Sequence, residues 1–162
     1  MSTLIHYLAI FFISMVPLIE IRGAIPYAVG IIKSGVDLNP IICCVLAIVG
    51  NMLPVPIIFF IARKVLEWGV DKPVIGGFFT FCLEKGHKGG EKLKEKAGKG
   101  LPYALFLFVG IPLPGTGAWT GTLAASILDM DFKSSVKAVI CGVLLAGIIT
   151  GLVSFGAFSA IF

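Results

Sequence analysis

Residues 17–26 read PLIEIRGAIP and residues 111–121 read IPLPGTGAWTG, and these two stretches decide the fold of the chain. Each interrupts a long apolar run, 4–32 or 101–128, near its middle. Proline removes a backbone donor and clashes with the preceding helical turn, whereas glycine permits backbone that other residues avoid. Irregular backbone at membrane depth is tolerated only where protein or water covers it. The two stretches therefore predict re-entrant or broken-helix hairpins that are buried inside the molecule.

The composition is typical of a membrane protein. Of the 162 residues, 57% are hydrophobic and only 14% are charged, whereas about a quarter of the residues in a soluble domain are charged. The mean hydropathy is +1.02. These values exclude a soluble enzyme, a disordered chain and a disulfide scaffold. The sequence offers no nucleophile–base pair and no cluster of metal ligands, so we predict a protein that is not an enzyme and uses no cofactor or metal.

The basic residues predict an orientation in the membrane. Nine of the thirteen Lys and Arg lie in residues 63–100, between the apolar blocks 4–62 and 101–162. Because cytoplasmic loops carry an excess of Lys and Arg, we expect this segment to be cytoplasmic and the chain to be a multi-pass protein of the inner (cytoplasmic) membrane. Within the segment, residues 84–99 fit either an amphipathic interfacial helix or a solvated linker. Nucleic-acid binding is not expected.

The two apolar blocks share one layout. In each, a broken run is followed by a short polar stretch and then by an unbroken run, 41–62 or 138–161, long enough to cross a bilayer. A shift of 94 residues pairs Gly23 with Gly117. We therefore predict an all-α integral membrane protein with a single membrane domain, 1–162, that is built as an inverted repeat of about 4–62 and about 101–162.

The topology of the broken runs stays open at this point. Re-entrant runs would invert the second repeat, placing Lys133 and Lys137 on the cytoplasmic side with the basic segment and Lys33 outside. Fully crossing runs would make the repeats parallel. Paired broken segments in inverted halves indicate the binding site of a transporter, and the distribution of lysines favours re-entrance.

Glu20 and Arg22 are the charged residues at membrane depth in the first broken run. Because a charge in the bilayer centre costs about 2.5 kcal/mol or more, such residues face the protein interior or a water-filled cavity. The functional interpretation makes Arg22 an anion clamp, since its planar fork binds two oxygens at once, and Glu20 a proton-coupling group. The structural interpretation is an ion pair that holds the hairpin. A turn would bring the two together or aim them at different partners.

The second broken run has no charge and offers backbone donors instead. Successive N–H groups of Gly115, Thr116 and Gly117 are able to form an anion nest, and a half-helix that starts near Gly117 would add its positive end. Thr116 and Thr120 add hydroxyl groups, and Trp119 adds a flat apolar wall. The alternative is that these residues serve only hairpin geometry and close packing.

Two features of the crossing runs add to the predicted site and assembly. Asn51 needs hydrogen-bond partners if it is buried, and we expect it to reach the carbonyls of a broken helix and to line the substrate path. Gly147 and Gly151 form a G-x-x-x-G pattern, which predicts close helix packing within the chain or across a homodimer.

The motif E-x-R-G-A-I-P at Glu20–Pro26 and the motif P-L-P-G-T-G-A-W-T-G at Pro112–Gly121 resemble the small multidrug export protein family, and the resemblance covers essentially the whole chain. That family looks distantly related to the DedA-like, VTT-domain membrane proteins, which have paired re-entrant hairpins. Some of those proteins recycle undecaprenyl phosphate, and some need proton coupling. By this resemblance, Glu20 and Arg22 match the acidic and basic hairpin residues. The second hairpin departs from the group, because residues 112–128 contain no arginine.

These observations predict a transporter that moves an amphipathic substrate across the cytoplasmic membrane. The expected substrate is an anionic lipid phosphate, similar to undecaprenyl phosphate, with coupling to protons. The alternatives are proton-coupled export of small cationic drugs and an uncoupled lipid scramblase or membrane scaffold. The expected partners are membrane lipids and a second copy in a homodimer. The predicted substrate-binding residues are Arg22, Asn51, Gly115, Thr116, Gly117 and Thr120, with Glu20 as the proton-coupling residue and no catalytic residue.

Overall fold

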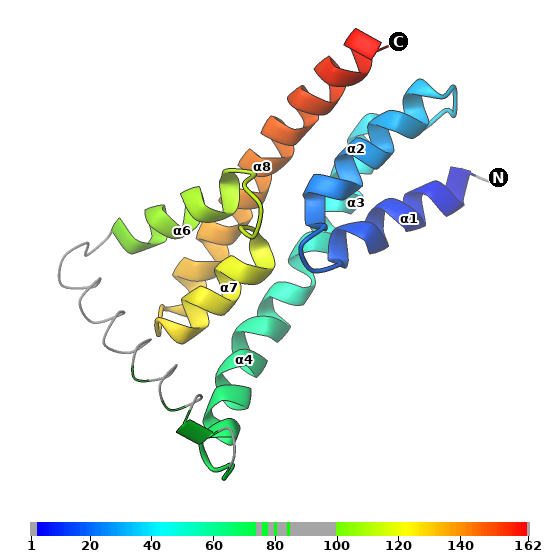
Figure 1. Ribbon diagram of the computed structural model, residues 1–162. Helices are drawn as coiled ribbons and strands as arrows, with labels where there is room; N and C mark the ends of the chain where they lie inside the picture. Colours follow the sequence, from blue (N-terminus) through cyan, green and yellow to red (C-terminus); the bar gives the residue numbers. More distant parts are fainter. Residues whose placement is uncertain (1–2, 74–75, 78–79, 81–83, 85–99, 162) are drawn as a thin grey trace.

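The structure is a computed structural model that describes residues 3–73, 76–77, 80, 84 and 100–161, and every regular element in these ranges is an α-helix. The predicted all-helical fold is therefore confirmed (Figure 1). The helices are α1 (Thr3–Met15), α2 (Glu20–Lys33), α3 (Pro40–Met52), α4 (Pro54–Val70), α6 (Gly100–Gly110), α7 (Ala118–Ile127) and α8 (Phe132–Ile161). The predicted amphipathic segment 84–99 lies, apart from Glu84, outside the described residues.

Two short helical hairpins contain the interrupted stretches. Helices α1 and α2 join at residues 16–19, and α6 and α7 join at residues 111–117. The first break is shorter than the sequence suggests, because α2 continues through Pro26. One lost backbone hydrogen bond does not end a helix that is held by its packing against α1, α3 and α8. The second half-helix begins at Ala118, next to the predicted start.

Long apolar helices accompany the hairpins. Helices α3 and α4 together form one apolar segment, Pro40–Val70, and α8 provides another, Phe132–Ala157; both are long and apolar enough to cross a membrane. Only Leu53 separates α3 from α4; its N–H still donates to the carbonyl of Val49 at 3.0 Å, and its φ and ψ of −61° and −40° stay in the helical region. Pro54 and Pro56 occupy the first turn of α4, where a missing donor is tolerated.

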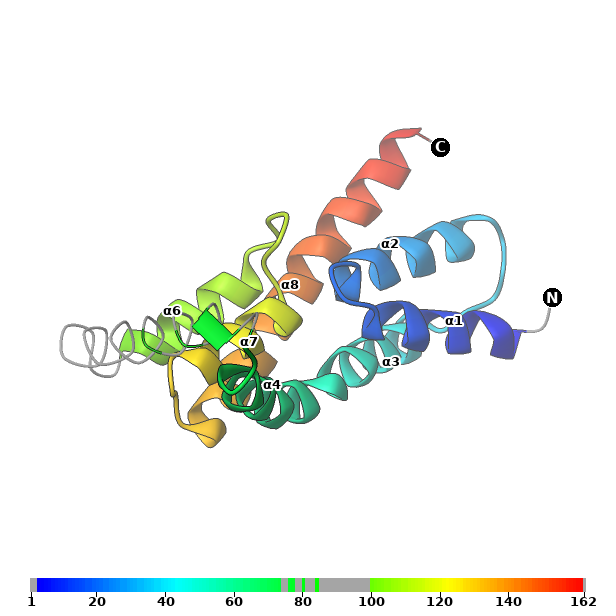
Figure 2. The ribbon, with the colours of Figure 1, turned by 60° about the horizontal axis from the view of Figure 1, so that its bottom comes forward.

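The two hairpins pack crosswise on the long helices. Helix α1 packs on α3 and α6 packs on α8, while α2 reaches across to α8 and α7 reaches across to α4. In Figures 1 and 2 the connecting turns of the two hairpins face each other near the centre of the molecule. The crossed packing brings the interrupted stretches of the two hairpins together.

The helix ends that follow the hairpins are also alike. After α2, the N–H groups of Ser34, Gly35 and Val36 bond to the carbonyls of Gly30, Ile32 and Ile31; after α7, those of Leu128, Asp129 and Met130 bond to Ala124, Ser126 and Ala125. Every donor and acceptor in the second set lies 94 residues after its counterpart in the first. Gly35 and Asp129 hold the matching left-handed position, with φ of 92° and 56°.

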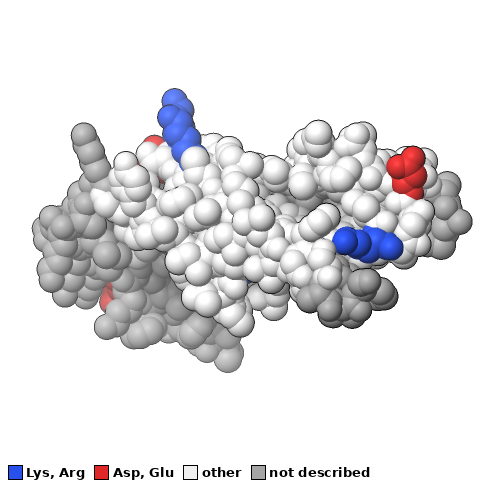
Figure 3. Space-filling view, turned by 90° about the horizontal axis from the view of Figure 1, so that it is seen from above, with Lys and Arg blue, Asp and Glu red and all other residues white. Residues whose placement is uncertain are grey.

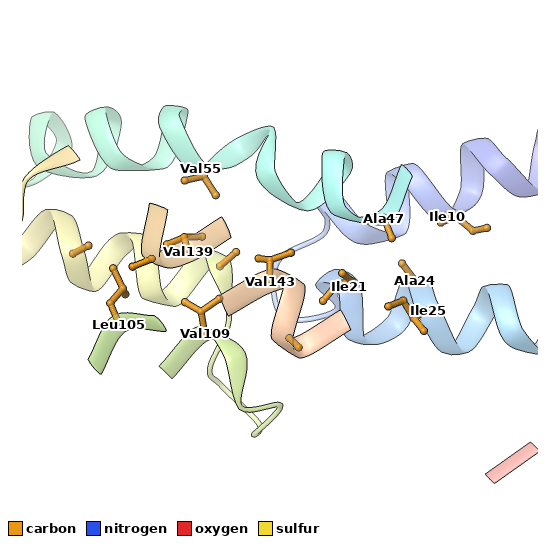
Figure 4. Close-up of a cluster of buried hydrophobic side chains, with 14 of the residues drawn as sticks. Ile10, Ile21, Ala24, Ile25, Ala47, Val55, Leu105, Val109, Val139 and Val143 are labelled. Atoms are coloured by element: carbon orange, nitrogen blue, oxygen red, sulfur yellow. The ribbon is translucent and has the colours of Figure 1, made fainter. Parts of the chain in front are cut away.

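The core runs along the middle of the helix assembly. Figure 4 shows Ile10, Ala24, Ile25 and Ala47 on one side, Val55, Leu105, Val109 and Val139 on the other, and Ile21 and Val143 between them. Ala24 and Ala47 are fully buried. Gly147 lies against Ile21 and Ile25 within the chain, whereas Gly151 has open space around it. The outward side chains are largely apolar, and few charges appear on the face seen in Figure 3.

Candidate functional site at the hairpin junction

The hairpin junction is formed by Glu20 and Arg22 of α2, by loop 111–117 and by the first turn of α7. The turn between α1 and α2 and the turn between α6 and α7 approach each other there (Figures 1 and 2). Glu20 has a φ of 51°, so the backbone leaves the first turn in a left-handed conformation that non-glycine residues rarely adopt. The hydrogen bonds that join α2 to the end of α6 and to the start of α7 link residues that are about 90 to 100 positions apart in the chain.

Glu20 closes the N-terminus of α7. Its side chain is buried, with 2% of the residue exposed. The N–H of Ala118 donates to Oε2 at 3.0 Å, and the N–H of Trp119 donates to Oε1 at 2.9 Å. The first N–H groups of a helix lack partners within the helix and carry its positive end. Because Gly117 at the N-cap has no side chain to accept these bonds, a carboxylate from the other hairpin fills the cap position.

Arg22 closes the C-terminus of α6. Its Nη2 donates to the carbonyls of Val109 at 3.3 Å and Ile111 at 3.2 Å and to Oγ1 of Thr116 at 2.9 Å. Its Nη1 donates to the carbonyls of Leu113 at 3.3 Å and Thr116. The last carbonyls of a helix form its negative end and favour a cation. Each charge of the pair therefore meets the helix end of opposite sign.

The geometry decides between the two arrangements of Glu20 and Arg22 that the sequence left open. Among the described residues no ion pair joins them, and they are aimed at different partners. Trp119 adds a further link, because its indole Nε1 donates to the carbonyl of Met15 at 3.2 Å. The junction is thus a set of polar contacts between the two hairpins within an otherwise apolar protein.

The predicted substrate-binding residues fall into two groups. Arg22, Thr116 and Gly117 meet in the junction, and the hydroxyl of Thr120 lies 3.5 Å from the Gly117 carbonyl. Gly115 sits in the loop with a φ of 82° and open space beside it. The first N–H groups of α7 do hold an anionic group, but that group is the carboxylate of Glu20.

Asn51 lies apart from these contacts. It is fully buried in α3, and neither its Nδ2 nor its Oδ1 has a hydrogen-bond partner among the described residues. The expected bond to the carbonyls of a broken helix is therefore not formed. Thr122 of α7 is also buried, its hydroxyl has no partner among the described residues, and no sequence pattern pointed to it. The cap on α7 could not be predicted from the sequence either, because Glu20 and the two N–H groups that it accepts from are 98 and 99 residues apart.

Gly117→Ala is expected to open the junction. Gly117 has a φ of 150°, and a Cβ there would lie 2.7 Å from Cδ and Oε1 of Glu20. Combined overpacking and backbone strain predict a loss of about 3 kcal/mol in the free energy of unfolding, measured in a detergent–SDS titration. Gly115→Ala is the control, because it meets only backbone strain and should cost about 1 kcal/mol. Equal losses for the two variants would contradict the proposed contact.

The fold and the apolar helices that are long enough to span a bilayer define an all-helical membrane protein. Residues 20–149, which make up most of the chain and include residues 20–26 of the first interrupting stretch and all of the second, match the family described as "Putative small multi-drug export protein". The chain belongs to this small multidrug export family. Neither a curated protein nor a solved structure matches it.

Proposed function

We propose that the protein is a membrane transporter whose hairpin junction moves an amphipathic substrate with an anionic head. The substrate class that we propose is a lipid phosphate. The observation that carries the proposal is the pairing of Glu20 with the start of α7 and of Arg22 with the end of α6. Charged groups at membrane depth are costly, and they mark substrate or proton paths in membrane proteins. In this protein the two charged side chains join the two hairpins, and these hairpins would have to separate for a substrate to pass.

The bonds that Glu20 accepts support the proposal of proton coupling. An ionised carboxylate accepts from both Ala118 and Trp119, whereas a protonated one loses its charge and part of its acceptor capacity. Protonation would therefore loosen the cap on α7. The freed N–H groups of α7 would then be available to a phosphate, which takes the place of the carboxylate. Arg22 would join them only by giving up part of its bonds to the end of α6 and loop 111–117. Loss of the proton would restore the cap and favour release.

Hairpin lengths support re-entrance. Helices α1 and α6 have 13 and 11 residues, or about 20 and 16 Å at 1.5 Å per residue, whereas the hydrocarbon core is about 30 Å thick. The crossed packing of α2 on α8 and of α7 on α4 supports an inverted repeat. The identical hydrogen bonds after α2 and α7 support it too. In this topology the segment 63–100 is cytoplasmic and the protein lies in the inner membrane.

Unpaired polar groups in the helix interior support a substrate path beside the junction. Asn51→Leu is expected to raise the free energy of unfolding by about 1 kcal/mol, because it removes a buried amide that has no partner in the described part of the chain. The same change should lower transport at least tenfold if the amide meets the substrate head. Thr122→Val removes only a hydroxyl and serves as the matched second variant. Unchanged transport in both variants would remove these residues from the proposed path.

The family description favours a second candidate, proton-coupled export of small cationic drugs. Wild-type proteoliposomes separate the candidates: we expect uptake of a fluorescent polyprenyl phosphate, no uptake of the matched polyprenyl alcohol, and no uptake of ethidium. Uptake of ethidium alone would favour the drug exporter. Equal movement of the phosphate and the alcohol without a proton gradient would favour a scramblase, and no movement of any of them would favour a scaffold.

We also propose a homodimer, since the thin wall of helices leaves the junction close to lipid. Gly147 is used within the chain, but Gly151 and Gly156 are open on α8 and available to a second copy. Multi-angle light scattering of the purified protein would report two chains per particle if this holds, and one chain if it does not.

A further inference from the structure

A groove on the outer face of α6 and α8, separate from the hairpin junction, combines apolar walls with hydrogen-bond donors. It has a volume of about 400 Å³, and its lining includes Tyr103 and Phe106 of α6 and Ser134, Lys137 and Cys141 of α8. Helices α6 and α8 run in the same direction there, since Gly142 lies against Phe106 and Val109 and Gly110 lies against Leu145. The groove therefore begins near the N-termini of both helices, whereas the junction lies beyond the C-terminus of α6.

The donors and the apolar groups are separated along the groove. Lys137 and the exposed Tyr103 face the part nearer to the helix starts, and neither has a polar partner among the described residues. Phe106 and Cys141 lie one turn deeper. Lys137 is five residues after Phe132, about 7.5 Å into the apolar segment. A lysine at that depth extends its ammonium group toward the interface.

Among the described residues, the charged groups at the start of α8 leave this end positive. Asp131 caps α8 through the backbone N–H and hydroxyl of Ser134, and these bonds hold the pKa of its carboxyl below the usual range. Asp129 is paired with Arg63 of α4. At the start of α8, the ammonium groups of Lys133 and Lys137 stand against the single carboxylate of Asp131. The N-termini of α6 and α8 add positive partial charge.

We propose that this groove binds an anionic phospholipid, with its phosphate at Lys137 and Tyr103 and one acyl chain along Phe106 and Cys141. The apolar floor and the cationic rim match an amphipathic molecule with a negative head, and a phospholipid presents both at the depth where the groove lies. In the proposed topology this end faces the cytoplasm, since α6 begins directly after the basic segment. The site requires no transport cycle and would be occupied in the resting protein.

Native mass spectrometry of the full chain, equilibrated with equal amounts of phosphatidylglycerol and phosphatidylcholine of the same acyl composition, tests the site. We expect the wild type to retain phosphatidylglycerol preferentially. Lys137→Gln should reduce that preference about fivefold, the effect of one lysine near an anionic membrane surface. Lys133→Gln is the matched control: Lys133 contributes to the positive charge of this end but does not line the groove, so its loss should reduce the preference less than the loss of Lys137.

A second variant tests the acyl part independently of charge. Cys141→Phe fills the floor of the groove and should lower retention of both lipids at the site, while the thermal unfolding midpoint shows that the protein remains folded. The proposal is overturned if the wild type shows no preference, if Lys133→Gln and Lys137→Gln act alike, or if folded Cys141→Phe retains lipid like the wild type. The readout is independent of flux, so a failure of the transporter proposal leaves it unaffected.

Discussion

Glu20→Ala is expected to cost about 3 kcal/mol in the free energy of unfolding, because it leaves the buried N–H of Ala118 and the partly buried N–H of Trp119 without acceptors. Glu20→Gln keeps the size of the side chain and one good acceptor, so its cost should be about half as large. Both variants should lose the response of transport to a proton gradient, since neither carries a titratable group at the cap. Unfolding in a detergent–SDS titration gives the first quantity, and proteoliposome flux gives the second.

The control for Glu20 is Glu67→Gln on α4. Glu67 accepts from Nε of Arg63 at 3.0 Å, but both side chains are about half exposed. Exposed ion pairs contribute little, so this acid-to-amide change should cost less than about 0.5 kcal/mol and leave transport unaltered. A loss at Glu67 that equalled the loss at Glu20 would show that the cap on α7 has no special role.

Arg22→Ala is expected to have the other large effect, a loss of about 4 kcal/mol and of transport. It withdraws five donated bonds from the end of α6 and loop 111–117, and it leaves the carbonyls there without their cation. Arg22→Lys keeps the charge but not the planar fork, so it cannot reach acceptors on both sides of the loop at once. We expect Arg22→Lys to recover less than half of the stability.

The control for Arg22 lies at the other end of the same helix. Lys33→Ala removes a cation whose Nζ lies 3.2 Å from Oγ of Ser159 and 4.7 Å from the Phe155 ring centre. Because this lysine is largely outside the core, its removal should cost less than about 1 kcal/mol. If Arg22→Ala unfolded no more readily than Lys33→Ala, Arg22 would not hold the two hairpins together.

The sequence was most informative where local backbone chemistry decides the structure. Proline and glycine indicated where both hairpins break, and the half-helix predicted to start near Gly117 begins at Ala118. The helix ends at Gly35 and Asp129 agree with the 94-residue shift, although neither residue was among the pairs that suggested it. Pro26 was less informative than it looked, because the packing of α2 outweighs one missing hydrogen bond.

The partners of the charged residues could not be predicted in the same way. Membrane depth singled out Glu20 and Arg22, but a sequence does not say which distant helix end each one meets. Those contacts depend on how α2 crosses to the second hairpin. The same limit applies to Asn51. The sequence indicated that this residue would need hydrogen-bond partners if it were buried, but not that its buried amide would have none among the described residues.

The central claim is that the junction of the two hairpins couples protons to the movement of an anionic lipid. Its most direct test is the initial rate of fluorescent polyprenyl phosphate uptake into proteoliposomes, with and without an imposed pH gradient, for the wild type and for Glu20→Gln. We predict that the gradient raises the wild-type rate at least fivefold and leaves the Glu20→Gln rate unchanged. The same gradient response in both proteins, or no uptake by the wild type, would contradict the claim.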